Sequence, residues 1–291
     1  MGKRMNHYIE RIKEVYPELI IDNVNANDIG QNNDVLIINN SLVFRFPKYE
    51  KGIVRLKEEV QILDHISDTI SISIPYPEYE SFELNEPGKV FTGYRLIEGD
   101  PFWNEHLVKV NHVDSMKLAK QLVTFLIEIH SVSKKTLVTS LNLIDNNPYE
   151  DMKELFHTIQ NKLFQFINEK SQTEISSLFE AFLSHKEPIK TTLIHGDFGA
   201  SNILWNSKNC EISGIIDFGG SGIGDPAYDF AGILSSYGMD FYNKCIDLYP
   251  NGSEIAKRVT FYKSTFALQE ALHGLKNNDN AAFENGIKDY R

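Results

Sequence analysis

The sequence has few cysteines, no long apolar run and no excess of positive charge. Its two cysteines, Cys210 and Cys245, lie far apart and outside any Cys/His cluster. This argues against a disulfide framework or a zinc site and favours a reducing compartment. No stretch approaches the roughly 20 apolar residues of a transmembrane helix. The first residues also lack the apolar run of a signal peptide. We therefore expect a cytoplasmic protein that does not bind a membrane.

The charge balance also restricts the partners. The 291 residues include 40 acidic and 29 basic ones, which gives a formal net charge of −11. Nucleic-acid-binding proteins usually present a basic face, so we expect no nucleic-acid partner. An acidic cleft would speed the approach of a cationic substrate, but the same charge could simply maintain solubility.

The apolar periodicity changes near residue 97. Before it, short runs that end in turns predict strands, and one amphipathic stretch predicts the main helix. After it, helical patterns dominate, and Ser171-Gln172-Thr173-Glu174 is typical of a capping box. The strands are expected at 19–24, 35–38, 42–46, 90–96, 192–194 and 212–216, and the helices at 5–15, 52–66, 118–130, 150–169, 174–185 and from 227. We predict an α+β monomer of two lobes, 1–96 and 97–291.

Two polar segments carry the chemistry. In the first, His195-Gly196-Asp197 is followed by Asn202, five positions after Asp197. In the second, Asp217-Phe218-Gly219 follows an apolar strand pattern. Phosphoryl transfer needs a residue that orients the hydroxyl and accepts its proton, together with oxygen ligands for Mg²⁺. Asp197 can be that base, and Asn202 and Asp217 can be the ligands.

A single Asp in a loop is usually a turn former, and a single D-F-G is a weak signal. Here H-x-D-x-x-x-x-N precedes D-F-G at the spacing found in protein kinases, with Gly196 in place of the usual Arg. The two segments together predict Mg²⁺-dependent phosphoryl transfer from a nucleotide.

These two segments and Gly224-Asp225-Pro226-Ala227-Tyr228-Asp229-Phe230 resemble the aminoglycoside phosphotransferases. Phe44-Arg45-Phe46-Pro47-Lys48 and the segment 237–241 are most similar to the 2″-phosphotransferases of that family. The resemblance implies a protein-kinase-like fold with a small, strand-rich, nucleotide-binding N-lobe. The larger helical C-lobe would hold the catalytic loop and the acceptor. It also implies that Asp197 is the base, that Asn202 and Asp217 hold Mg²⁺, and that Asp229 braces the site; an ordinary helix-terminal Asp is the alternative for Asp229.

In the first lobe, the resemblance assigns phosphate binding to Arg45, at a position where the family usually has Lys. Lys48 is a second candidate, and an exposed strand Arg is the alternative for Arg45. Glu59 is the expected acidic partner of Arg45, with Glu58 as its competitor. The loop 28–34, which contains Gly30, would cover the phosphates although it is not G-x-G-x-x-G.

The resemblance also implies a hinge after the strand at 90–96. Backbone groups of Arg95 and Ile97 would hold the purine, and Tyr94 would lie behind it or belong simply to the core. A bulky aromatic at that position accompanies the use of GTP in the 2″ enzymes, so GTP, ATP or both are expected as phosphate donors.

The acceptor is expected to be a small hydroxylated molecule, with an aminoglycoside favoured. Asp240 and Glu270 are candidate acids for such a polycation, and Asp151 and Glu154 are further ones; each could be only a surface charge. The stretch 231–236 lacks the acids of the nearest relatives, which would suit a macrolide. A kinase of a small metabolite and a catalytically dead pseudokinase stay open as alternatives.

Overall fold

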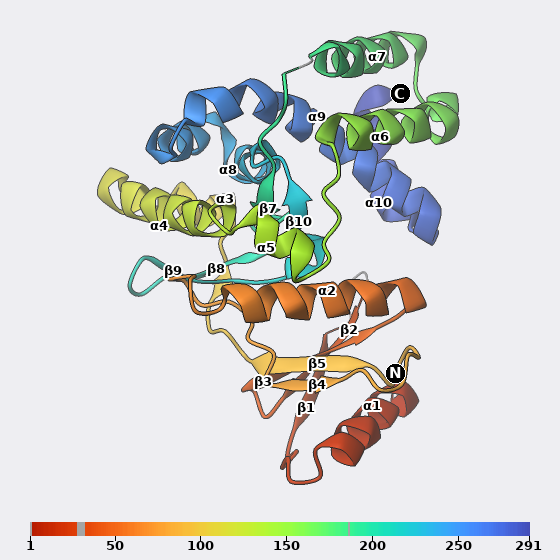
Figure 1. Cartoon of the computed structure of the whole chain (residues 1–291), viewed down its shortest axis with the longest axis vertical. Helices are drawn as coiled ribbons and strands as arrows, with labels where there is room; N and C mark the ends of the chain where they lie inside the picture. The colour runs from red at the N-terminus through yellow and green to blue at the C-terminus, as the bar shows by residue number, and fades with distance from the viewer. Residues whose placement is uncertain (1, 28–32, 186) are drawn as a thin grey trace. The chain divides into compact units, whose positions relative to one another are not determined.

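The computed structural model describes residues 2–27, 33–185 and 187–291. The chain divides into two compact units (Figure 1). The first unit comprises Met1–Phe102 and Ser201–Ser221, and the second comprises Trp103–Ala200 and Gly222–Arg291. This division differs from a single boundary at residue 97. The chain returns to the first unit at Ser201, because the segment 201–221 forms a hairpin that pairs with Asp100–Pro101.

The first unit is built on a five-stranded sheet with the strand order β1-β2-β3-β5-β4. All neighbouring strands in it are antiparallel. Its elements are α1 (Gly2–Val15), β1 (Val24–Asn27), β2 (Asn33–Ile38), β3 (Leu42–Pro47), α2 (Glu50–Ile66), β4 (Tyr79–Ser81) and β5 (Phe91–Arg95). A second sheet, with the order β6-β8-β9, joins β6 (Asp100–Pro101), β8 (Ile203–Asn206) and β9 (Glu211–Ile215), and the 3-10 turn η2 (Phe218–Gly220) follows it.

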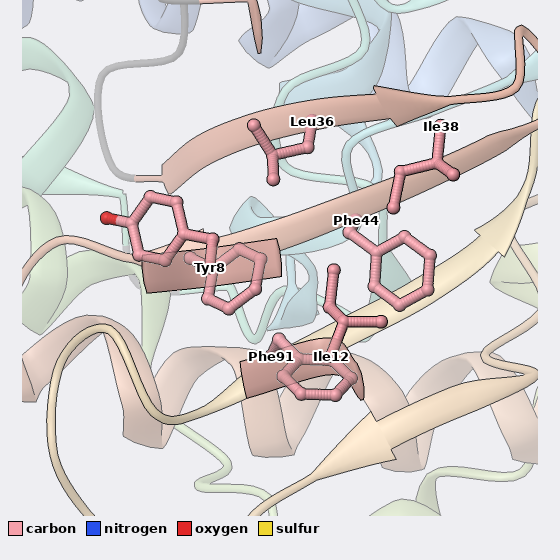
Figure 2. Packing of buried hydrophobic residues seen from close by; sticks show 7 residues of the cluster. Tyr8, Ile12, Leu36, Ile38, Phe44 and Phe91 are labelled. Atoms are coloured by element: carbon pink, nitrogen blue, oxygen red, sulfur yellow. The ribbon is translucent and has the colours of Figure 1, made fainter. Parts of the chain in front are cut away.

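The central strand β3 is buried on both of its faces. Side chains alternate along a strand, so Phe44 and Phe46 point to one face and Val43 and Arg45 to the other. Phe44 and Phe46 pack with Phe91 and with Tyr8 and Ile12 of α1, as the close view in Figure 2 shows for most of these residues. The opposite face carries Arg45 toward α2.

Glycine on β5 makes room for this core. Gly93 lies opposite Phe44 in the register of β3 and β5. A Cβ at Gly93 would lie 2.7 Å from Cε1 of the Phe44 ring. The Phe44 ring therefore occupies the space that a side chain at position 93 would need.

The strand expected at Leu19-Ile20-Ile21 is wrong. The first strand begins only at Val24, which pairs with Ile38, the last residue of β2. The strand β2 ends at Ile38, so it provides no ladder partner for residues 19–21. The Asn39 side chain takes over there. Its Oδ1 accepts from the N–H groups of Asp22 and Asn23, and its Nδ2 donates to the Ile20 carbonyl.

The second unit is mostly helical. Its helices are α3 (Asn104–Leu107), α4 (His112–His130), α5 (Lys134–Thr139), α6 (Pro148–Lys162), α7 (Glu169–Ser184), α8 (Ala227–Leu248), α9 (Gly252–Asn277) and α10 (Asn280–Ile287), with the 3-10 turns η1 (Phe164–Phe166) and η3 (Lys288–Tyr290). A short antiparallel pair, β7 (Thr192–Ile194) with β10 (Gly222–Gly224), carries the chain into and away from the motif segments. Helix α8 is interrupted at Gly238, whose φ is 76°.

Three helix boundaries differ by several residues from the sequence prediction. The helix expected from 118 already begins at His112. The helix expected over 150–169 ends at Lys162, and the next helix begins at Glu169 rather than at 174. The N-cap is Asn168, whose side chain accepts a hydrogen bond from the N–H of Ser171 at 2.8 Å. Asn caps helices as well as Ser does, so the capping signal lay three residues before the predicted one.

The predicted α+β class is confirmed, with a strand-rich first part and a helical remainder. Within the described ranges, no helix is both long and apolar enough to cross a bilayer.

Candidate active site

In the first unit, Arg45 contacts two carboxylates at once. Its Nη1 donates to Oε1 of Glu59 on α2, and its Nη2 lies 3.0 Å from Oδ1 of Asp217. Arg45 and Glu59 are buried, whereas the Asp217 side chain is half exposed. The expected pairing of Arg45 with Glu59 is therefore present. Glu58 instead pairs with the exposed Arg55.

The surroundings shift the pKa values of the buried pair. Burial tends to lower the pKa of Arg45, but the carboxylates of Glu59 and Asp217 outweigh burial and raise it. Burial raises the pKa of Glu59, and the Arg45 guanidinium together with a hydrogen bond from the Phe218 backbone opposes that rise. Arg45 consequently keeps its charge. One terminal nitrogen of the guanidinium binds the buried Glu59, and the other binds the half-exposed Asp217.

The two predicted metal ligands lie at the same end of a hairpin. Ile203 of β8 pairs with Ile215 of β9, and just beyond this pair the Ile216 N–H donates to the Asn202 carbonyl at 2.9 Å. Asp217 is the next residue. Its φ of 62° is left-handed, a conformation that Asp tolerates better than most side chains. The tight backbone turn brings Asp217 to Arg45.

Glycine at position 219 keeps this turn compact. A Cβ there would lie 3.3 Å from Oδ1 of Asp217 and 3.8 Å from Nη2 of Arg45. The D-F-G glycine thus passes directly beside the Arg45–Asp217 contact.

The donor set fits magnesium. Asn202 and Asp217 offer hard oxygen ligands, and Mg²⁺ usually takes only one or two protein carboxylates and completes its shell with phosphate and water. In the described part of the chain, no group of three or more His, Cys, Asp or Glu side chains could hold a metal. One carboxylate and one amide need no such group.

In the second unit, Asp197 lies on a loop after β7 and is exposed. Its N–H donates to Nδ1 of the buried His195 at 3.2 Å, and its carbonyl accepts from the Gly199 N–H at 2.9 Å. Both backbone polar groups of Asp197 are thus fixed by hydrogen bonds, while the residue itself is exposed to solvent.

Asp229, near the start of α8, holds the same loop from within the protein. It is fully buried. Its Oδ2 accepts from the His195 N–H and its Oδ1 from the Gly196 N–H, each at 2.9 Å. Gly196 has a φ of 76°, a conformation that a side chain at this position would strain. Asp229 therefore braces the loop, and it is not merely a helix-terminal charge.

Two further residues of α8 continue this contact along one face of the helix. Gly232 allows the Phe198 carbonyl to approach so closely that a Cβ would lie 2.2 Å from it. Ser236 Oγ accepts from the Ala200 N–H at 3.0 Å. Asp229, Gly232 and Ser236 are spaced by three and then four positions, which places them on one helical stripe. The sequence analysis missed Gly232 and the role of Ser236, although this spacing beside the H-G-D-F segment could have indicated them.

The predicted nucleotide-binding residues occupy different surroundings. Tyr94 is buried on the same face of the sheet as Arg45, and burial raises its pKa to about 12. The Arg95 side chain is exposed and pairs with Glu78 at 2.7 Å. Ile97 packs on Gly214, where a Cβ would lie 2.4 Å from Ile97 Cγ2. Gly30 lies outside the described residues.

The alternative phosphate cation and the candidate acids each have their own surroundings. Nζ of Lys48 lies 3.5 Å from Oδ1 of Asp34. Asp240 is exposed just after the interruption of α8. Glu270 accepts a hydrogen bond from Asn285 at 2.8 Å. Asp151 and Glu154 are both exposed, and the pKa of Asp151 is raised by partial burial and by the charge of Glu154.

Comparison with known proteins decides the family. Residues 23–260 match the phosphotransferase enzyme family, a match that covers most of the chain. This chain belongs to that family. The protein is therefore a phosphotransferase with an alcohol group as acceptor, and the predicted relationship to the aminoglycoside phosphotransferases is confirmed. Among curated proteins, the viomycin phosphotransferase of Streptomyces vinaceus is 28% identical over 204 residues, which is 67% of each chain.

Solved structures agree on the fold of this phosphotransferase. The GDP and kanamycin complex of APH(2″)-IIIa matches with a TM-score of 0.89 and 24% identity, covering 98% of this chain and 97% of that one. A macrolide 2′-phosphotransferase type I matches with a TM-score of 0.76 and 15% identity, covering 97% and 96%. At these identities the similarity establishes the fold, and the predicted kinase-like architecture is confirmed.

Proposed function

We propose that this phosphotransferase moves the γ-phosphate of GTP or ATP to a hydroxyl of a small antibiotic, most favourably an aminoglycoside. Asp197 is the catalytic base. Asn202 and Asp217 hold Mg²⁺, and Arg45, held by Glu59, binds the nucleotide phosphates. The proposal includes a cytoplasmic, monomeric enzyme. The low cysteine content, two in 291 residues, supports the cytoplasmic location.

The observation that carries the proposal is the double contact of Arg45. A cation on the third strand, paired with a buried acid on the following helix and adjacent to the D-F-G Asp, is the arrangement on which protein kinases depend. Here Arg45 contacts both Glu59 and Asp217. A pseudokinase would have no need to keep this cation in contact with both acids.

In the transfer step, Asp197 orients the acceptor hydroxyl and accepts its proton. The acceptor oxygen forms a bond to the γ-phosphorus while the bond from that phosphorus to the β–γ bridging oxygen breaks. Bound Mg²⁺ would neutralise charge on the β- and γ-phosphate oxygens. The exposure of Asp197 and the hydrogen bonds that fix its backbone support this role, because a base must be both reachable and held in place.

For the nucleotide, we assign the segment from Tyr94 to Ile97 to the purine, and the loop containing Gly30 to the phosphates. The Leu96 N–H is already used by the Ser41 carbonyl at 2.8 Å. The neighbouring backbone of Arg95 and Ile97 is therefore the part of this segment assigned to the base. The GDP complex of a structural relative supports a guanine nucleotide as one donor.

For the acceptor, a second candidate follows from the similarity to viomycin phosphotransferase. An aminoglycoside is favoured by the structural relative bound to kanamycin and by the acidic net charge of −11. Asp240 and Glu270 stay the proposed acids for such a cation. The stretch 231–236 has no acid, a feature that would suit a macrolide better.

The test is transfer by the purified protein with Mg²⁺, GTP or ATP, and kanamycin, viomycin or a macrolide. We expect turnover with at least one pair and none after addition of EDTA. Asp197→Ala should lose transfer by several orders of magnitude, as expected for a catalytic base, and should keep the nucleotide-induced rise in melting temperature. Unchanged transfer by Asp197→Ala would refute the assignment of Asp197 as the catalytic base. Nucleotide binding without turnover of any acceptor would favour the pseudokinase.

A further inference from the structure

A buried chain of three side chains leads from the end of α8 to the catalytic loop in the second unit. Tyr249 follows α8, His130 ends α4, and Asp229 holds the loop. The Tyr249 hydroxyl lies 2.9 Å from Nδ1 of His130, and Nε2 of His130 lies 3.1 Å from Oδ2 of Asp229. We call Tyr249, His130 and Asp229 the His130 relay.

The hydrogen-bond directions in this relay follow from what each group can do. The Asp229 carboxylate accepts the N–H groups of His195 and Gly196, and an ionised carboxylate cannot donate. His130 must therefore present a hydrogen on Nε2. In a neutral imidazole Nδ1 is then an acceptor, so the Tyr249 hydroxyl donates to it. Burial and nearby charges raise the pKa of Tyr249 to about 12, which keeps this donor protonated at neutral pH.

Burial makes these bonds important. The side chains of His130 and Asp229 are almost completely shielded from water. A buried carboxylate depends on its hydrogen-bond donors, and the loss of one leaves it poorly compensated. Without the Tyr249 hydroxyl, Nδ1 of His130 loses its hydrogen-bond donor, and the ring is held in place by one hydrogen bond fewer.

We propose that His130 and Tyr249 are positioning residues for phosphoryl transfer: they keep Asp229 oriented so that it holds the backbone before Asp197. This inference rests on the proposed function for its catalytic consequence. The hydrogen bonds of these two residues lead to Asp229 and not to a residue proposed to touch the substrate. They act through Asp229 and the amides of His195 and Gly196.

The first test measures the amides themselves. Tyr249→Phe removes one hydroxyl and keeps the ring. That ring packs edge-on against the imidazole of His130, with the two ring centroids 5.6 Å apart. Hydrogen exchange at the amides of His195 and Gly196 should become about tenfold faster, the loss expected for one hydrogen bond in such a chain. Tyr149→Phe is the matched control, because that hydroxyl also makes one hydrogen bond in the second unit, to the Glu187 carbonyl at 2.9 Å. Equal exchange in the two variants would overturn the relay.

The second test measures catalysis. Tyr249→Phe should lower kcat about tenfold with the KM for nucleotide nearly unchanged, whereas Tyr149→Phe should leave both constants unchanged. His130→Phe, which removes both ring nitrogens, should lower kcat further. Faster exchange with unchanged kcat per folded molecule would overturn the catalytic part of the proposal.

A rescue variant separates the relay from simple packing. The side-chain nitrogen of Gln is the same number of bonds from Cα as Nε2 of His, and an amide nitrogen is always a donor. His130→Gln should therefore protect the two amides better than His130→Phe. Adding Tyr249→Phe to His130→Gln should change nothing further. If the wild-type protein transfers phosphate to no acceptor, the proposed function fails, and the exchange measurements still decide the relay.

Discussion

The Arg45 guanidinium lies 3.0 Å from the Asp217 carboxylate while its other terminal nitrogen is bound to Glu59. One planar fork can donate in two directions at once, which a single ammonium on a flexible stem does less well. Arg at this position therefore does more than supply a positive charge. It joins the helix α2 to the D-F-G turn, and it does so with Glu59 deeply buried.

Breaking this buried pair should be costly for folding. We expect Arg45→Met to reduce the free energy of unfolding by about 3–5 kcal/mol, because Glu59 is left buried without its partner. Arg45→Lys should lose less than Arg45→Met. The double variant Arg45→Met/Glu59→Leu should recover much of the loss, since apolar residues of similar volume often replace a buried ion pair. Urea unfolding monitored by circular dichroism measures all three.

The exposed pair Arg55–Glu58 on the same helix is the control, with an N–O distance of 3.0 Å. Surface pairs contribute roughly 0–1 kcal/mol, so Arg55→Met should change stability little. Equal losses for Arg45→Met and Arg55→Met would show that the Arg45 contact has no special weight.

The close approach of the catalytic loop to α8 gives a second prediction. A Cβ at Gly232 would lie 2.2 Å from the Phe198 carbonyl, so Gly232→Ala must push the loop and the helix apart. We expect it to reduce kcat strongly and to destabilise the fold by about 1–3 kcal/mol, the usual cost of overpacking. The control is Gly222→Ala, because a Cβ at Gly222 meets nothing within 4 Å. Thermal unfolding and kcat are measured for both, and similar values for the two variants would contradict the prediction.

The contrast between local and tertiary information explains what the sequence could predict. The H-x-D-x-x-x-x-N and D-F-G segments are local, so spacing alone is enough to predict Asp197, Asn202 and Asp217 as site residues. The strand β1 was misplaced because its register depends on where β2 ends, which is Ile38. His130 and Tyr249 carry no motif at all. His130 lies 99 positions before Asp229 and 119 positions before Tyr249 in the chain, so only the tertiary fold brings the three side chains together.

The buried hydroxyl of Tyr94 gives a prediction for alkaline pH. Burial raises its pKa from 10.0 to about 12 in the folded state. Tyr94 is protonated in both the folded and the unfolded state below pH 10, so its contribution to the free energy of unfolding is fully present there. The contribution is lost as the pH rises from about 10 to about 12, because the unfolded chain releases the proton first. Tyr94→Phe should show a smaller fall in the free energy of unfolding over this range. An identical pH profile for wild type and variant would exclude Tyr94 as a contributor.

The last prediction concerns a buried threonine whose hydroxyl has no hydrogen-bond partner among the described residues. Thr92 lies opposite Arg45 in the register of β5 and β3, and within the described part of the chain its buried Oγ1 makes no hydrogen bond. An unpaired buried hydroxyl costs free energy, so Thr92→Val should be neutral or stabilise the protein by up to about 1 kcal/mol. Thr265 is the matched control, because it is equally buried but its Oγ1 donates to the Tyr262 carbonyl at 2.7 Å and accepts from Gln269 at 2.9 Å. Thr265→Val should destabilise by about 1–2 kcal/mol, since it leaves the Gln269 donor without this partner. Urea unfolding of both variants measures the difference, and a loss at Thr92 as large as that at Thr265 would mean that the Thr92 hydroxyl is satisfied in solution.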